Sequence, residues 1–163
     1  MIQRKYWKFK ERKEMFELES KDPDIITIKT PKTTINLNVA EGVIDAGLEV
    51  GAIEGPGEFE IGDATIRGID AKEGRTIYDA EIGGIHIGII GGTEAALEEL
   101  GVSDVLCTSS VKAIREVEPK LVVAMGNVDG MVTELKLTAR TEKKLKIKKI
   151  DNLPATLEVV VLN

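Results

Sequence analysis

The sequence predicts an α+β fold in which two β-sheets pack face to face with a few short helices outside them, a four-layer αββα sandwich. Residues 43–90 consist of short apolar runs separated by glycine-rich turns, which is typical of antiparallel strands. After Gly92 the pattern changes to alternating strands and helices, which indicates a β-α-β layer. A chain of 163 residues can bury one substantial core, so a single domain spanning residues 1–163 is expected.

The expected strands are short runs rich in β-branched residues, and the two sheets are expected to come from the two halves of the chain. In chain order the expected strands cover residues 6–9, 15–19, 25–28, 33–39, 43–44, 52–53, 58–61, 64–69, 76–80, 85–90, 102–108, 121–125, 144–150 and 157–162. Two helices are expected among the later strands. Thr93 is expected to cap the first, which stops at Gly101, and Ser109 or Ser110 to cap the second, which Pro119 ends.

Composition is that of a soluble globular protein, with 42% hydrophobic and 31% charged residues. No apolar stretch is long enough to cross a bilayer, and the basic start of the chain lacks the apolar segment of a signal peptide. The lone cysteine, Cys107, lies in an apolar strand and is expected to be inert core. A cytoplasmic location without a membrane partner is expected.

The charge is unevenly distributed, although the net charge is only −6. Residues 1–13 carry six basic side chains against one acid, and residues 136–149 carry seven against one. Side by side, the two segments would form a basic stripe for a polyanion such as a nucleic acid. Lysines that alternate with apolar residues are more typical of a protected edge strand. Exposed strand edges at 1–19 and 144–150 would favour a homo-oligomer or a protein partner.

Several segments occur in the order and spacing of a known family. They are GPGEFEIG at 55–62 with IRGI at 66–69, TIY at 76–78 with EIGGIHI at 81–87, EPKLVVAM at 118–125, and LP at 153–154 with LEVVVL at 157–162. In this series the chain resembles the compact branch of the metallo-β-lactamase superfamily that includes the ascorbate-6-phosphate lactonase-like hydrolases. The resemblance covers residues 24–163 and implies that family's αββα fold.

The resemblance also implies where two metal ions would bind. Residues 29–36, KTPKTTIN, align with the family's S/T-H-x-H-x-D-H-N motif, and two later segments align with its remaining ligands. Seven ligand positions are filled here by residues that cannot hold zinc, in chain order Thr30, Lys32, Thr34, Ile35, Ile89, Gly92 and Gly126. Thr34 and Gly92 replace aspartates, and the other five replace histidines. The seven are expected to line a relict cleft without metal, cofactor or catalytic residue.

Zinc chemistry supports this interpretation. A hydrolytic zinc ion takes three or more His, Asp, Glu or Cys ligands and lowers the pKa of its bound water to ~7. This chain has one histidine, His86, which lies on an alternating strand and is expected to be packed or at a rim. Unpaired ligands left in an empty site would cost ~1–3 kcal/mol each, so Thr, Ile and Gly are suitable replacements. The ammonium of Lys32 is expected to reach solvent or pair with an acid.

The expected function is therefore that of a pseudoenzyme: a non-catalytic metallo-β-lactamase-like protein with a structural or protein-interaction role. One alternative is metal-independent binding of a small anion, or hydrolysis, in the relict cleft. The loop Gly88–Thr93 could cradle a phosphate, but it lacks the spacing of the known phosphate-binding loops. Another alternative is polyanion binding through the basic segments, against which the 4% aromatic content argues.

Overall fold

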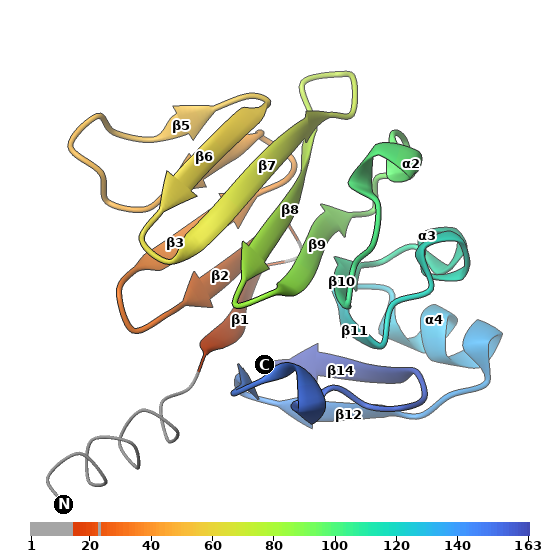
Figure 1. Cartoon of the computed structure of the whole chain (residues 1–163). Helices are drawn as coiled ribbons and strands as arrows, with labels where there is room; N and C mark the ends of the chain where they lie inside the picture. Colours follow the sequence, from red (N-terminus) through yellow and green to blue (C-terminus); the bar gives the residue numbers. More distant parts are fainter. Residues whose placement is uncertain (1–14, 23) are drawn as a thin grey trace, which may run out of the picture.

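The computed structural model describes residues 15–22 and 24–163, which form two β-sheets packed face to face (Figure 1). The first sheet has the order β13 (Leu145–Ile147), β1 (Phe16–Asp22), β2 (Ile25–Lys29), β3 (Thr34–Asn38), β4 (Val43–Asp45) and β5 (Ile53–Glu54). The second has the order β12 (Ala139–Glu142), β14 (Glu158–Leu162), β11 (Leu121–Ala124), β10 (Val105–Thr108), β9 (Ile85–Gly91), β8 (Thr76–Ile82), β7 (Ala64–Asp70) and β6 (Gly57–Ile61).

The described helices lie on the outer face of the second sheet (Figure 1). They are α2 (Leu97–Leu100), α3 (Val111–Val117) and α4 (Val128–Leu135), with a 3₁₀ turn at Ile150–Asn152. Their buried side chains form a core with Ile77, Ile90 and Leu106 of the sheet. The predicted α+β class with few helices is confirmed, although no described residue forms a helical layer over the first sheet. No helix within the described ranges has the length and apolar character needed to span a bilayer.

Strand β9 shows how the two cores are built. Six of its seven residues are buried, because one face meets the first sheet and the other meets α2. Ile87 and Ile89 belong to the core between the sheets, and Ile90 belongs to the core under the helices. A strand covered on both faces suits the parallel pairing that β9 makes with β10.

The expectation that each half of the chain builds its own sheet is wrong. The chain passes from the first sheet to the second between β5 and β6, so β6–β9 join the C-terminal strands. Strand β13 then returns to the first sheet and pairs with β1, with Phe16 opposite Ile147. Long-range pairing of this kind is not encoded in the local pattern.

This pairing also changes the expectation about exposed edges. Strand β1 lies inside the sheet, and Lys144 on the loop before β13 approaches Glu17 at 3.7 Å and Glu19 at 3.9 Å. Only β13 remains as an edge in this part of the chain, so the argument for a homo-oligomer from residues 1–19 loses its basis within the described residues. The expected strand at 6–9 lies outside them.

The start of α3 agrees with the cap predicted from the sequence, and the start of α2 does not. The side chain of Ser110 caps α3 by accepting a hydrogen bond from the N–H of Ala113 at 3.1 Å, as predicted. The predicted Thr93 cap of the first helix is wrong, because α2 begins only after Ala96, which has a φ of 62° and makes no side-chain cap. The Thr93 hydroxyl instead lies 3.5 Å from the guanidinium of Arg75.

Candidate functional site

The candidate site lies where the parallel strands β9, β10 and β11 end side by side. Ligands bind most often at the carboxyl ends of parallel strands, where loops can present side chains. Here the loops begin with Gly92 after β9, Ser109 after β10 and Met125 after β11, with Gly126 next. Both glycines are exposed.

Hydrogen bonds fasten the three strand ends to one another. The Thr108 hydroxyl donates to the Gly91 carbonyl at 2.6 Å, and the N–H of Ser109 donates to the same carbonyl at 3.0 Å. The N–H of Met125 donates to the Thr108 carbonyl at 3.0 Å. These polar groups are therefore used in hydrogen bonds between the three strand ends.

The hydroxyl group of Ser110 also takes part in hydrogen bonds within the protein. Its hydroxyl donates to the Glu94 carboxylate at 2.5 Å and accepts the capping bond from Ala113, and its side chain is buried. A nucleophilic serine needs a base that can take its proton. Glu94 fixes the position of this hydroxyl, and Ser110 has the structural role of capping α3.

Three of the seven predicted cleft positions lie at or next to this edge. Gly92 and Gly126 follow β9 and β11, and a Cβ at Gly126 would meet open space. A Cβ at Gly92 would lie 3.1 Å from the Ser109 hydroxyl oxygen. Ile89 is on β9 but points into the core between the sheets, with 0% of its surface exposed.

The other four predicted positions, Thr30, Lys32, Thr34 and Ile35, lie at the opposite end of the sandwich, so the expected single relict cleft is wrong. Strand β2 starts at the edge where β9 ends, since Asp24 and Val39 lie 3.8–3.9 Å from where a Cβ of Gly91 would be. It therefore ends at the other edge, against the β6–β7 turn, where a Cβ of Gly62 would lie 2.9 Å from Thr33.

The segment aligned with the family's metal motif is a tight hairpin turn. The Thr30 hydroxyl donates to the Asp63 carboxylate at 2.5 Å and accepts from the N–H groups of Lys32 and Thr33, each at 3.1 Å. Lys32 is exposed, in agreement with the expectation that its ammonium reaches solvent. Thr34 is also exposed, whereas Ile35 is buried in the core opposite Ile28.

His86 lies on the outer face of the second sheet, near the start of β9, at the rim as expected. Its Nδ1 is 3.2 Å and 3.3 Å from the two Asp79 oxygens, and its Nε2 is 3.6 Å from Glu81. Arg67 approaches Asp79 at 3.6 Å from the neighbouring strand. Cys107 points into the core between the sheets, where burial raises the pKa of its thiol, so a Cys–His pair is not formed.

Burial raises the pKa of Asp79 above its ordinary value, although the hydrogen bond and charge of His86 and the charge of Arg67 act in the opposite direction. The native state therefore holds this proton more tightly than the unfolded chain, so stability falls as pH rises through the raised pKa. We expect the stability of Asp79→Asn relative to the unsubstituted protein to be greater at pH 7 than at pH 4. Urea unfolding at both values measures the difference, and a loss of stability at pH 7 would mean that the ion pairs outweigh burial.

A hollow of about 490 Å³ lies beside the candidate edge, between the β7–β8 loop and the turn after β9. Its cations, Lys72 and Arg75, would suit a small anion. Glu73 and Glu94 line the same hollow, and the Arg75 guanidinium donates a hydrogen bond to the Thr93 hydroxyl. The positive charge is thus balanced locally.

The basic segment near the end of the chain is also interleaved with acids. Arg140 pairs with Glu158 at 2.5 Å and with Glu142 at 3.8 Å, and Lys144 lies near Glu17 and Glu19. The other half of the expected basic stripe, residues 1–13, lies outside the described residues. The polyanion alternative therefore stays a prediction.

Comparison with known proteins identifies the fold. No family model matches the chain, and no curated protein has a significantly similar sequence. Among solved structures, the chain is similar to a presumed Zn-dependent hydrolase of the metallo-β-lactamase superfamily from Thermotoga maritima, with a TM-score of 0.65 and 19% identity over 90% of this chain and 98% of that one. The architecture is therefore that of the metallo-β-lactamase fold.

The residues at the candidate edge do not fit the metal that the fold implies. Zinc is held by imidazole, thiolate or carboxylate groups, and the strand ends present glycines and the hydroxyl groups of Thr108 and Ser109. Within residues 15–22 and 24–163 no three His, Cys, Asp or Glu side chains form a group that could hold a metal ion. The one histidine lies near the start of β9 and not at its end.

Proposed function

We propose that this chain is a degenerate member of the metallo-β-lactamase superfamily that does not carry out metal-dependent hydrolysis and has a structural or protein-interaction role. The observation that carries the proposal is the chemistry of the edge where β9, β10 and β11 end. Positions that the resemblance assigns to metal ligands carry Gly92, Gly126 and the core residue Ile89.

Two physical arguments support the proposal. A zinc site that activates water needs three ligands on one ion, and a ligand at position 89 would have to leave the apolar core to take part. In addition, the Thr108 hydroxyl and the Ser109 N–H donate hydrogen bonds that join the strands, and the Ser110 hydroxyl caps α3. Hydrogen bonding that joins the ends of β9, β10 and β11 to one another is consistent with a structural role for this edge.

Thermal unfolding with added metal tests the proposal. A ligand that binds only the native state raises its stability by RT ln(1 + [L]/Kd), so a true site at 100 Kd would add about 2.7 kcal/mol. We expect zinc to leave the unfolding midpoint unchanged, apart from any weak effect of the His86 cluster. That effect should disappear in the control variant His86→Gln. A concentration-dependent increase that survives His86→Gln would point to a metal site at the edge and contradict the proposal.

A further inference from the structure

A second hollow, of about 560 Å³, lies on the other side of the helices and has a different character. It is formed where the carboxyl ends of α2 and α3 meet the starts of β10 and β11. Its apolar residues are Leu97, Val102 and Val117. Val102 is 73% exposed at its rim.

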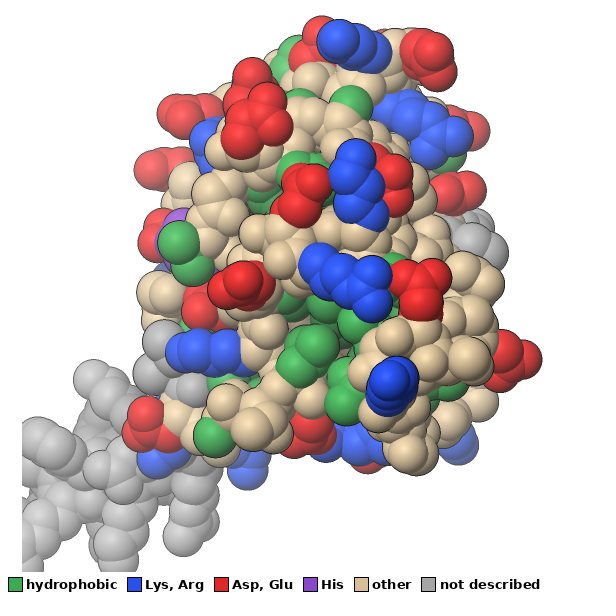
Figure 2. Space-filling model, turned by 90° about the vertical axis from the view of Figure 1, so that its right-hand side faces the viewer, with side chains coloured by type: hydrophobic (Ala, Val, Ile, Leu, Met, Phe, Trp, Pro, Cys, Tyr) green, Lys and Arg blue, Asp and Glu red, His purple; other side chains and the backbone are tan. Residues whose placement is uncertain are grey.

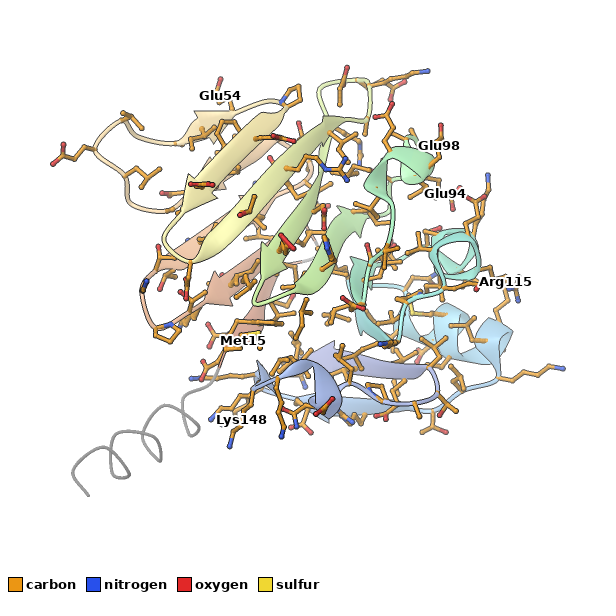
Figure 3. The ribbon with its side chains drawn as sticks, in the orientation of Figure 1. Met15, Glu54, Glu94, Glu98, Arg115 and Lys148 are labelled. Atoms are coloured by element: carbon orange, nitrogen blue, oxygen red, sulfur yellow. The ribbon has the colours of Figure 1, made fainter. Side chains whose placement is uncertain are left out.

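The rim of this hollow is acidic. Its charged lining residues are four acids and one lysine, namely Glu98, Asp104, Glu116, Glu118 and Lys120. Glu98 projects from α2 on this side (Figure 3). Among the described residues Glu98, Glu116 and Glu118 form no ion pair, in contrast to Arg115 and Glu134, which pair at 3.3 Å. The carboxyl ends of two helices add to the negative potential.

Figure 2 shows the helical face of the molecule, where acidic and basic side chains are interspersed and apolar side chains reach the surface between them. An apolar hollow with an unneutralised acidic rim suits a basic segment that also carries large apolar side chains. Residues 1–14 of this chain have that chemistry. Residues 1–13 hold six basic side chains against one acid, together with Tyr6, Trp7 and Phe9.

The place where this segment joins the fold brings the hollow within reach. The Met15 side chain packs against the β8–β9 turn, at the position where a Cβ of Gly83 would be. Three residues further on, the His86 carbonyl accepts a hydrogen bond from the N–H of Asp104, in the lining of the hollow, at 2.8 Å. Fourteen extended residues can span roughly 45 Å, which is about the diameter of a domain of this size.

Electrostatic repulsion also disfavours contact between the basic segment 1–14 and the neighbouring lysine-rich end of strand β13. The N–H of Met15 donates to the Ile147 carbonyl at 3.0 Å, so the first described residue lies beside the lysine-rich end of β13. Figure 3 shows Met15 and Lys148 at the same end of the molecule. Like charges repel there, whereas the acidic rim attracts.

We propose that the hollow between α2 and α3 is a binding site for a basic, aromatic-containing segment, and that residues 1–14 of the same chain occupy it. The aromatic side chains contact Leu97, Val102 and Val117, and the basic ones face Glu98, Glu116 and Glu118. The proposal does not depend on the loss of metal chemistry, because the hollow lies away from the ends of β9, β10 and β11.

Fluorescence of the full-length chain tests this proposal, since Trp7 is its only tryptophan. At low salt we expect blue-shifted emission and weak quenching by acrylamide. The variant Glu116→Lys/Glu118→Lys should shift the emission to the red and raise the quenching constant several-fold. About 1 M salt should act in the same direction, because it reduces the Debye length to about 3 Å. Val102→Ser should have a similar effect through the loss of an apolar contact, without changing the charge of the rim.

A matched control is Glu49→Lys/Glu99→Lys, which makes the same charge change at two exposed acids outside the hollow and should leave Trp7 protected. Unfolding midpoints of all variants check that the fold is intact. Emission typical of exposed tryptophan in the unsubstituted protein would overturn the proposal. An emission maximum and quenching constant that stay the same in the rim variants would also overturn it. Protection that disappears on dilution would assign the hollow to the segment of a second copy and would also overturn it.

Discussion

Replacing Ile89 by histidine is expected to lower the free energy of unfolding by about 2–5 kcal/mol and to create no zinc site. Ile89 is fully buried on β9, with Tyr78 opposite it on β8 and Cys107 opposite it on β10. An imidazole there would lose apolar contacts and bury two ring nitrogens. It would not find the three ligands that a hydrolytic zinc ion needs, because Gly92 and Gly126 have no side chain and burial raises the pKa of the neighbouring Cys107 thiol.

Urea unfolding with and without zinc measures both parts of this expectation. Ile89→Val is the matched control, because it keeps the apolar character and should cost only about 0.5–1.5 kcal/mol. Zinc should leave both variants unchanged. A histidine variant that zinc restores to the stability of the unsubstituted protein would show that enough of the ligand set survives at this edge.

Replacing Gly88 by alanine is expected to cost about 1–3 kcal/mol through overpacking. A Cβ on Gly88 would lie 2.7 Å from the Ser103 hydroxyl oxygen, 2.9 Å from Leu106 and 3.1 Å from Leu100. These side chains pack α2 and β10 against β9, so the added methyl group would push the helical layer away from the sheet.

Ser103 offers a direct check of this mechanism. Its hydroxyl is buried and has no hydrogen-bond partner in the structure, so Ser103→Ala alone should leave stability unchanged or raise it. In the double variant Gly88→Ala/Ser103→Ala the hydroxyl oxygen closest to the new Cβ is absent. The loss of stability caused by Gly88→Ala should therefore be smaller than in the single variant. A double-mutant cycle by urea unfolding measures this coupling. Strictly additive effects would contradict the contact.

The sequence was informative wherever local chemistry decides the structure. Residues 85–90 predicted a strand, and β9 is formed by Ile85–Gly91. Ser110 was predicted as a cap and is one. Helix α4 was missed, although Val128, Met131, Val132 and Leu135 stand at helical spacing and pack against the core under the helices. Gly130 in its interior and the absence of a side-chain cap at Asn127 weakened the local helix signal.

The candidate site was predicted only in part, for a physical reason. A motif alignment places residues along the chain but does not give the direction in which a strand crosses the sandwich. Pro31 and Lys32 lie in a turn that sends β3 back along β2, which puts Thr30 and Ile35 at the end away from Gly92. The contact between Thr30 and Asp63 of the β6–β7 turn depends on the packing of distant segments, which no local pattern shows.

The central claim is that the strand ends cannot hold catalytic metal, and elemental analysis combined with hydrolysis assays tests it most directly. Protein purified from zinc-supplemented medium should contain far less than one zinc per chain and should not cleave ester or lactone substrates above the rate in buffer. One or more zinc ions per chain, together with cleavage that a chelator abolishes and added zinc restores, would contradict the account.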